Sequence, residues 1–475
     1  MSMEQGLNPE RFRGFCYVNM VMRENSSKSG LYLFVSLLAV FLFVQQQTLA
    51  SEIPQGTQLV HWVLPGESLH RIALQYLPLT EELTVEDLIE KIRRLSGIDG
   101  SLIRPNQRLL IPSVRKNPVT AKTVPKEIDF QGKGIYINRY SMACQKMRRL
   151  ADEIVSHGGN TVILDGKDMS GRLSYSSRVN LANEIGAAHN PPMGDLSKLI
   201  HYLHYKGLHV GVRLVLFYDP LLAEKKSDLA LRSSVTGEPW MENGRVAWVD
   251  PAQPYVQRYN LDIAEELAKM GVDEIQFDYI RFPTSENIQY GTSGSSNEII
   301  PRHKIITGFL AKARKELTDY KVLISIDVFG ILAWGQQEDI QLTGQKIGDL
   351  ARHCDVVSPM IYPSHFYGPF QGMANPATHP FTLVFETCRR FSGFLGKSKV
   401  TLRPWIQAFR LGANAFDQEY VLEQLRALSE SEAQGWLLWN AGNAYGVAWD
   451  ALAQWKDNTK TAKEKTVGTG PLAGN

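Results

Sequence analysis

The sequence predicts an α/β protein: a (β/α)8 TIM-type barrel preceded by a small βααβ unit. The chain has 475 residues, which is more than one ordinary domain requires. Its 44% hydrophobic and 21% charged residues are enough to form a large core and exclude a disordered chain. Between residues 130 and 457, strand-like runs and amphipathic helical stretches alternate, as parallel strands joined by helical crossovers require.

Residues 1–50 have the order of a secretory signal. The uncharged apolar run Leu31–Val44 follows Arg23 and Lys28 and precedes a possible cleavage point at Ala50. This run is shorter than the ~20 residues that span a bilayer core, so a cleaved signal peptide is favoured over an N-terminal signal anchor. We therefore expect an exported protein that is periplasmic, cell-wall-associated or extracellular. It would contact a membrane only if the segment stays uncleaved.

Residues 58–114 form a separate unit in sequence order strand, helix, helix, strand. Ser68 is placed to cap a first helix, and a second helical pattern covers Val85–Leu95. The run Val63–Ala73, with its Pro-Gly-Glu-Ser-Leu, and the closing run Ile103–Pro112 resemble the LysM module. The resemblance implies binding of peptidoglycan or another N-acetylglucosamine-containing glycan.

Two departures from the LysM pattern leave a second interpretation open. Asn106 stands where the family usually has glycine, and the middle of the unit, Leu77–Ile98, is long. The unit could therefore be a folded spacer that no longer binds glycan. Residues 115–129, polar with two prolines, are predicted to be a linker.

Residues 130–457 supply the eight predicted barrel strands. They are Gly134–Asn138, Thr161–Asp165, His209–Phe217, Glu274–Tyr279, Val322–Val328, Val356–Ile361, Thr401–Gln407 and Gly435–Trp439. A doubly wound open sheet fits less well, because no Gly-x-Gly-x-x-Gly follows the first strand. The Lys-, Thr- and Gly-rich tail, residues 458–475, is predicted to be disordered.

The charge pattern argues against nucleic-acid binding, and the cysteine spacing argues against a zinc ribbon. Lys and Arg total 51 and Asp and Glu 49, and the two signs are mixed along the chain, so no nucleic-acid footprint is visible and a neutral partner is expected. The four cysteines lie far apart with no Cys-x-x-Cys pair, which excludes a zinc ribbon.

The predicted strands end in residues that suit a sugar pocket. Active sites of such barrels lie where the strands end. Carboxylates follow or end several successive strands, whereas aromatic and amide side chains end the last ones. Aromatic faces stack on sugar rings, amides bond hydroxyl groups, and two carboxylates do the acid/base work of glycoside cleavage.

Several of these motifs carry a family resemblance. The runs Gly271–Pro283, Ile326–Gly330, Ser358–His365 and Arg403–Gln407, together with Asp165-Gly-Lys-Asp168, are similar to a bacterial family of glycoside hydrolases of the amylase-like barrel kind. The resemblance spans nearly the whole barrel and implies hydrolysis of O-glycosyl bonds, which export and the LysM-like unit would direct to a cell-wall or extracellular polysaccharide. It does not indicate the substrate.

Asp278 and Asp327 are the predicted catalytic pair. Strand alternation turns both inward at the ends of the fourth and fifth barrel strands. Asp278 is assigned as nucleophile or charge stabiliser, and Asp327 as general acid. The alternatives are an Asp278–Arg281 ion pair that only fixes the loop, and a loop-capping role for Asp327.

A wider set of residues is predicted to bind substrate. It comprises Asp165, Asp168, Arg213, Arg281, Tyr362, His365, Trp405, Gln407, Trp439 and Asn440. Asp165 and Asp168 could instead be the acid pair or hold Lys167. Arg213 could tune Asp278, bind a substrate carboxylate or pair structurally with Asp165. Trp405, Trp436 and Trp439 could form a stacking platform or only fill the barrel.

Two other function classes remain open from sequence. One is a non-catalytic glycan-binding barrel, and the other is a metal-dependent deacetylase or phosphodiesterase that uses the Asp cluster with His365. No His-x-His or His-x-x-x-His occurs among the motif residues, which disfavours the metal-dependent class. We therefore predict no metal site and no cofactor. Asp250 is interpreted as the N-cap of a helix that starts near Pro254.

Overall fold

The computed structural model describes residues 57–127, 129–290, 300–412 and 415–467. The predicted signal segment lies outside these residues. Within them, no helix combines the length and apolarity needed to cross a bilayer.

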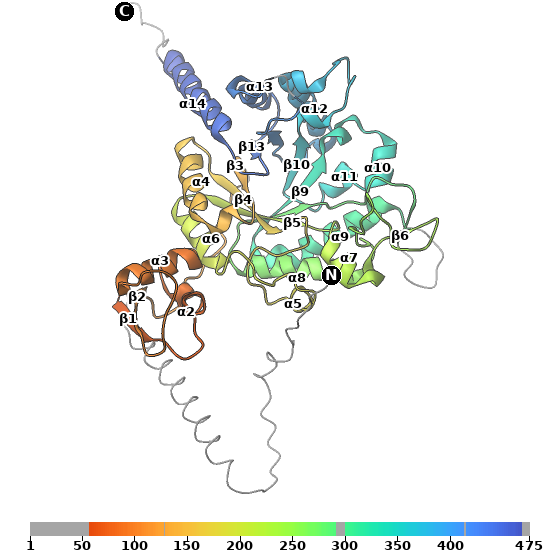
Figure 1. The fold of residues 1–475 in the computed structure, drawn as a ribbon. Helices are drawn as coiled ribbons and strands as arrows, with labels where there is room; N and C mark the ends of the chain where they lie inside the picture. The colour runs from red at the N-terminus through yellow and green to blue at the C-terminus, as the bar shows by residue number, and fades with distance from the viewer. Residues whose placement is uncertain (1–56, 128, 291–299, 413–414, 468–475) are drawn as a thin grey trace, which may run out of the picture. The chain divides into compact units, whose positions relative to one another are not determined.

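The larger part is a closed barrel of parallel strands, as predicted (Figure 1). The barrel strands are β3 (Gly132–Ile137), β4 (Thr161–Lys167), β5 (His209–Val215), β7 (Glu274–Asp278), β9 (Leu323–Phe329), β10 (Val356–Ile361), β11 (Thr401–Leu402), β12 (Trp405–Gln407) and β13 (Gly435–Trp439). Neighbours pair in parallel, and β9 pairs with β10 to close the ring. The seventh predicted strand is split into β11 and β12 around Arg403 and Pro404, where proline has no N–H to donate to the ladder.

Helices cover the outside of the barrel (Figure 1). They are α4 (Gln145–Ser156), α5 (Asn180–Glu184), α6 (Leu196–Tyr205), α7 (Pro220–Lys225), α8 (Pro254–Lys269), α9 (Arg302–Leu317), α10 (Gln337–Thr343), α11 (Ile347–Leu350), α12 (Pro380–Leu395), α13 (Gln418–Ser429) and α14 (Gly446–Val467). A two-stranded ribbon, β6 (Arg232–Ser233) with β8 (Ile288–Gln289), lies in the loops. Helix α14 extends to Val467 and so reaches into the tail of residues 458–475, for which the sequence predicts disorder.

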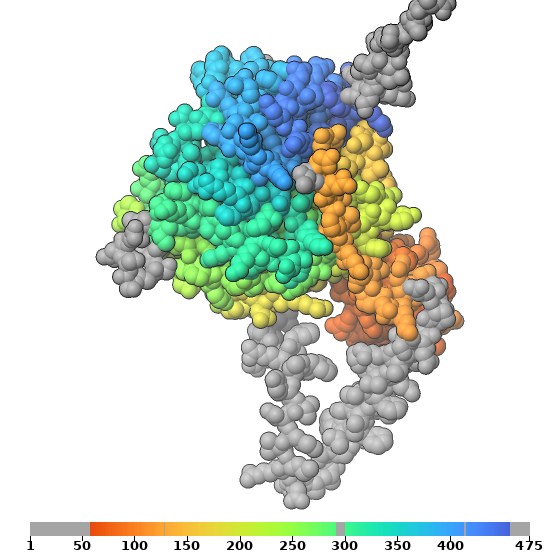
Figure 2. Space-filling view, turned by 180° about the vertical axis from the view of Figure 1, so that it is seen from behind, coloured from red at the N-terminus to blue at the C-terminus, as the bar shows by residue number. Residues whose placement is uncertain are grey.

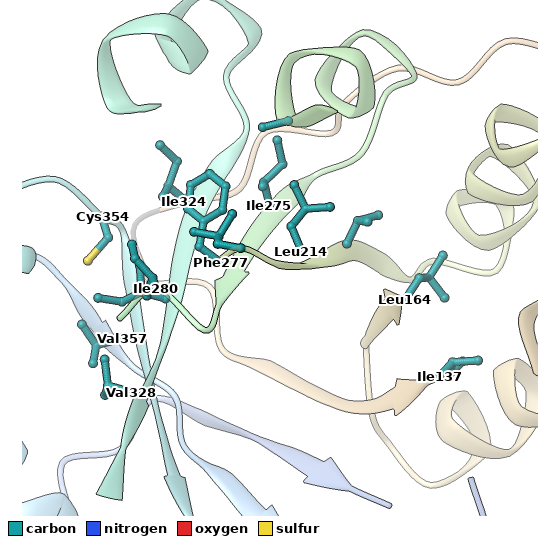
Figure 3. Packing of buried hydrophobic residues seen from close by; sticks show 14 of the residues in the cluster. Ile137, Leu164, Leu214, Ile275, Phe277, Ile280, Ile324, Val328, Cys354 and Val357 are labelled. Carbon is teal, nitrogen blue, oxygen red and sulfur yellow. The ribbon is translucent and has the colours of Figure 1, made fainter. Parts of the chain in front are cut away.

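Strand alternation separates the apolar layer from the polar interior. Leu164, Leu214 and Phe277 are fully buried and point from their strands towards the helices (Figure 3). Each such side chain contributes about 1.5–3 kcal/mol to folding. The alternating residues Arg213 and Gln276 therefore point into the barrel, which is how charged groups come to lie at its centre.

The unit that resembles LysM has the predicted βααβ order. It consists of β1 (Thr57–Trp62), α2 (Leu69–Tyr76), α3 (Val85–Ser96) and β2 (Arg108–Val114), with β1 and β2 antiparallel. Ser68 caps α2 through the Arg71 N–H, as predicted. Asn106 has φ +63°, and its N–H donates to the Val63 carbonyl at 2.8 Å. Asparagine tolerates this left-handed conformation, which accounts for its replacing the usual glycine.

The linker is bound along the barrel instead of hanging free (Figure 2). The Thr123 hydroxyl donates to the Val272 carbonyl at 2.7 Å, and the Val124 N–H donates to the Asp273 carboxylate at 2.7 Å. Gly271, at φ +90°, leaves room for this approach, since a Cβ there would lie 2.5 Å from the Ala121 backbone. The two prolines therefore belong to a segment that contributes to the barrel surface.

Candidate active site

A cavity of about 610 Å³ opens where the barrel strands end. Its size is typical of a small-molecule site. Charged groups line one part of it, namely Arg213, Asp278, Arg281 and Asp327. Apolar and aromatic groups line the rest, namely Met169, Tyr279, Phe329, Ile331, Met360, Tyr362, Phe366, Tyr367, Phe370, Trp405 and Trp439, together with His365 and Gly330.

Asp278 is fixed by an arginine and by its own backbone. Arg213 reaches one carboxylate oxygen from Nε at 2.8 Å and from Nη2 at 2.7 Å. The other oxygen accepts from the Tyr279 N–H at 2.6 Å. Tyr279 has φ +51°, a conformation that costs energy in a bulky residue. The chain thus accepts local strain directly after the carboxylate that it orients.

Arg213 joins two buried carboxylates. Its Nη1 lies 2.8 Å from Asp165, whose other oxygen accepts from the Tyr136 hydroxyl. Burial raises the pKa of Asp165 above its ordinary value, and Arg213 acts against that rise. Arg213 therefore contacts Asp165 and Asp278 at the same time, so these two sequence interpretations of Arg213 are compatible. Because protein carboxylates occupy this guanidinium, it is poorly placed to bind one from a substrate.

Asp327 has a different environment from Asp278. The register of β7 with β9 sets Gln276 opposite Ser325, so Asp278 and Asp327 are the next inward residues on neighbouring strands. One Asp327 oxygen accepts from Trp405 Nε1 at 2.8 Å. Burial, and then the charge of Asp278, raise the pKa of Asp327 well above its ordinary value.

Arg281 does not pair with Asp278, contrary to one sequence interpretation. Its guanidinium lies over the rings of Phe329, Trp248 and Tyr279, and its Nη1 donates to the Phe282 carbonyl at 3.0 Å. Arg213 takes the position beside Asp278 because it points inward from β5, the strand that pairs with β7.

The aromatic part of the predicted set is largely brought together. Tyr362, His365, Trp405 and Trp439 all line the cavity, and the two tryptophan rings meet edge to face at 5.5 Å. Desolvation lowers the pKa of His365 below its ordinary value. Trp436 is not part of this group, because alternation along β13 turns it to the outer core.

Four predicted binding residues lie outside the cavity lining, and one of them is Asp165, whose contacts are with Arg213 and Tyr136. Asp168 pairs with Arg139 at 3.0 Å. The Gln407 amide donates to the Phe409 carbonyl at 2.9 Å and accepts from the Ser364 N–H at 3.1 Å. The Asn440 amide likewise bonds backbone groups of its own and a neighbouring loop. Asp168, Gln407 and Asn440 position loops around the site.

Lys167 is not held by Asp165 or Asp168, which corrects that expectation. The pairing of β4 with β5 shifts register between Asp165 and Lys167. This bulge turns Lys167 to the helix side, where Asp219 lies at 2.9 Å and Asn260 at 2.7 Å from its Nζ.

Asp250 is not the N-cap of α8, which also corrects the sequence interpretation. Gln253 occupies the N-cap position. The Asp250 side chain accepts from the Ala252 N–H at 2.9 Å within the preceding turn.

Sequence reasoning missed the apolar wall and one strand residue. The wall residues Phe366, Tyr367 and Phe370 lie in a loop after β10, where no periodicity shows which side chains turn inward. Tyr136 could have been found, since alternation along the first predicted strand turns it inward beside Asp165.

Comparison with known families and structures agrees with this geometry. The family model described as "Putative glycosyl hydrolase domain" matches residues 134–445, and the LysM domain model matches residues 61–112. None of the curated proteins matches this chain. The LysM domain suggests carbohydrate binding, and the hydrolase domain suggests a glycan substrate.

Three solved structures illustrate the likeness. The glycoside hydrolase domain of PgaB (BpsB) from Bordetella bronchiseptica is 14% identical, with TM-score 0.52, over 68% of this chain and 98% of that one. A hypothetical protein from Ruminiclostridium thermocellum is 34% identical, with TM-score 0.37, over 41% of this chain and 97% of its own. The spore cortex-lytic enzyme SleL of Bacillus megaterium is 13% identical, with TM-score 0.41, over 84% and 98%.

The PgaB likeness shows a shared barrel fold and nothing finer at that identity. The family model, by contrast, matches well over half of the chain. The chain therefore belongs to the family described as a putative glycosyl hydrolase domain, and it carries a LysM domain before its barrel.

Proposed function

We propose that this chain is an exported glycoside hydrolase that cleaves O-glycosyl bonds of a cell-wall or extracellular polysaccharide. The observation that carries the proposal is a pair of carboxylates, Asp278 and Asp327, at the ends of neighbouring strands in one cavity. Glycoside hydrolysis needs two such groups in different protonation states. Arg213 and the Tyr279 N–H contact Asp278, whereas Asp327 is buried and has a raised pKa.

Asp327 is the proposed general acid. Burial and the charge of Asp278 raise the pKa of Asp327, which favours the protonated form that a general acid needs. In the proposed reaction the proton passes to the glycosidic oxygen as the bond from that oxygen to the anomeric carbon breaks. The leaving sugar then departs as a neutral alcohol.

Asp278 is the proposed nucleophile or charge stabiliser. Arg213 and the Tyr279 N–H hold both of its oxygens, so the carboxylate meets the developing positive charge at the anomeric carbon in a fixed position. Either Asp278 bonds to that carbon and water later displaces it, or it stabilises the charge while water attacks. Each route consumes one water, which gives its OH to the anomeric carbon and a proton that restores Asp327, and leaves one new reducing end.

The aromatic side chains that line the cavity beside the carboxylates support a sugar as the ligand. Trp405 and Trp439 offer aromatic faces and edges beside the carboxylates. The Tyr362 ring borders the same space and lies 6.5 Å from the Trp439 ring. Such surfaces pack against the C–H faces of sugar rings while nearby polar groups bond the hydroxyls.

Release of reducing ends tests the proposal. The purified chain, incubated with a panel of bacterial wall glycans and exopolysaccharides, is expected to generate new reducing ends from at least one of them. The Asp278→Asn protein serves as the inactive control. If no glycan is cleaved but one is bound with the barrel required, the non-catalytic glycan-binding alternative replaces the hydrolase.

The LysM domain is proposed to hold the chain on peptidoglycan. In a pull-down, the full chain is expected to sediment with insoluble peptidoglycan, and a chain that begins at Asn117 is expected to remain in solution. The shorter chain keeps the linker residues Thr123 and Val124 that bind the barrel. Equal retention of both proteins would make the domain a spacer.

A metal-dependent deacetylase is the weaker alternative. His365 is the one histidine among the cavity-lining residues. Across the part of the chain that the structure describes, no group of three or more His, Cys, Asp or Glu side chains is arranged to hold an ion. Release of acetate without new reducing ends would favour this alternative.

A further inference from the structure

Arg281 is a cavity-lining cation without a directly bound carboxylate among the described residues, although Asp278 and Glu242 act on its charge from a distance. It contributes to the cavity wall, and no carboxylate of those residues forms an ion pair with it. Its guanidinium lies 4.3 Å from the ring centre of Phe329, 4.8 Å from Trp248 and 4.9 Å from Tyr279. The rings hold the side chain in place without neutralising it.

Three other enclosed arginines of the barrel form ion pairs, whereas a fourth, Arg302, donates to the Leu342 and Ser285 carbonyls. Arg213 bridges Asp165 and Asp278, Arg403 pairs with Glu274, and Arg139 pairs with Asp168. Within the part of the chain that the structure describes, Arg281 instead donates one hydrogen bond, to the Phe282 carbonyl. A guanidinium carries five N–H donors, so most of those on Arg281 remain available.

The surroundings of Arg281 penalise its charge. Desolvation lowers the pKa of this guanidinium below its ordinary value, although arginine stays charged in proteins. An enclosed charge of this kind is costly unless a partner arrives. A ligand that brings a negative group to the cavity would both offset that cost and use the free donors.

We propose that Arg281 binds a carboxylate of the substrate, so that the glycan cleaved is an acidic one. The inference rests on the proposed function and narrows its substrate class. Arg281, Asp278 and Asp327 share one cavity, so the acidic sugar unit lies at or next to the bond that is cleaved. This replaces the neutral partner expected from overall charge, which averages over the surface and does not report on a single site.

A carboxylate fits this position better than a phosphate. A planar guanidinium matches a carboxylate with two parallel hydrogen bonds. One available guanidinium balances a single negative charge, whereas a phosphate monoester dianion would face the nearby Asp278 carboxylate with half its charge unmatched. The carboxylate could belong to a uronic acid or to the lactyl ether of a wall amino sugar freed of its peptide.

Binding to acidic sugars and to their neutral counterparts tests the proposal. The Asp327→Asn chain is used because asparagine keeps the uncharged state proposed for Asp327 and leaves the ligand intact. Calorimetric titrations compare oligouronates, and wall oligosaccharides with a free lactyl carboxylate, each with its carboxyl-reduced form. At least one acidic form is expected to bind at least ~10-fold more tightly than its neutral form. The arm that responds identifies the source of the carboxylate.

Arg281 variants assign the preference to this residue. Arg281→Gln is expected to abolish the acidic preference, and Arg281→Lys to retain part of it. Arg302→Gln is the matched control, because Arg302 also lies over two rings, Phe282 and Tyr290, but outside the cavity lining. Thermal melting of each variant checks folding, and the lysine variant remains informative if the glutamine variant does not fold.

The outcomes separate this proposal from the hydrolase proposal. Equal binding of acidic and neutral forms, or an acidic preference that survives Arg281→Gln, overturns the role of Arg281. Tighter binding of a phosphorylated glycan than of the carboxylated one also overturns it. If wild-type chain cleaves neutral glycans and shows no acidic preference, the hydrolase stands and this inference fails. If acidic glycans bind more tightly through Arg281 but no glycan is cleaved, the role of Arg281 stands and the hydrolase proposal fails.

Discussion

Asp278→Asn and Asp327→Asn are each expected to lower turnover by at least ~10²-fold on a glycan that the wild-type chain cleaves. The first change removes the negative charge that Arg213 and the Tyr279 N–H orient towards the anomeric carbon. The second removes the carboxyl group whose raised pKa favours the protonated form required of a general acid. Initial rates of reducing-end release at saturating substrate measure both effects.

The control separates lost chemistry from lost folding. Asp152→Asn changes a carboxylate on α4 that pairs with Lys206 at the surface, so its turnover is expected to match wild type. All three variants should melt cooperatively. Wild-type turnover in either cavity variant would remove that residue from the catalytic pair.

The pH profile distinguishes the two roles within the same experiment. If Asp327 donates a proton, kcat falls as pH rises through its raised pKa. The Trp405 Nε1–H hydrogen bond favours the ionised form of Asp327, so Trp405→Phe should move that limb to higher pH. Trp439→Phe changes a neighbouring ring without this bond and should leave the limb in place. A limb that Trp405→Phe shifts to lower pH, or leaves unmoved, would contradict the assignment of Asp327.

The strand-end residues of the site were predictable, because strands alternate with a period of two. Asp278, Asp327 and Trp439 follow directly from counting back along their predicted strands, and all three line the cavity. The same counting fails at Lys167, where a bulge shifts the register of β4 by one residue and reverses the side chain. A local insertion of this kind leaves no trace in the hydrophobic pattern.

The sequence could not predict which charged residues form ion pairs with one another. Arg213 and Arg281 were both candidates for Asp278, and only the pairing of β5 with β7 decides between them. The sequence also could not predict that Phe366 and Phe370 line the cavity, because both belong to an irregular loop. Sequence periodicity therefore locates the inward ends of strands, while loops and ion pairs depend on the closed fold.

Arg403→Met is expected to destabilise the barrel by about 3–5 kcal/mol, the cost of leaving a buried carboxylate without its cation. The side chain of Arg403 is almost fully buried and reaches both oxygens of Glu274, with Nη1 at 3.0 Å from one of them. Glu274 also meets His209 Nε2 at 2.8 Å. Gly132 makes room for the guanidinium, because a Cβ there would lie 2.8 Å from Arg403 Nη1.

Chemical denaturation with two further variants tests this cost. Arg389→Met breaks an exposed pair with Glu386 on α12 and should cost less than about 1 kcal/mol. Combining Arg403→Met with Glu274→Gln removes both charges and should recover much of the lost stability. A single-variant cost below that of Arg389→Met would mean that the pair contributes little to the fold.

The pH dependence of the Arg403→Met deficit provides the sharpest check. Burial alone would raise the pKa of Glu274, but Arg403 and His209 outweigh it and hold that pKa below its ordinary value. A depressed pKa contributes stability above the unfolded value of about 4.3 and loses it as pH falls towards the folded value. The unfolded state is the same in both proteins, so the deficit follows the folded-state pKa of Glu274. It should shrink as pH falls from the higher pKa that Glu274 has without Arg403 towards the depressed wild-type value. A deficit that is constant across this range would assign the cost to packing around the missing guanidinium and not to the charge on Glu274.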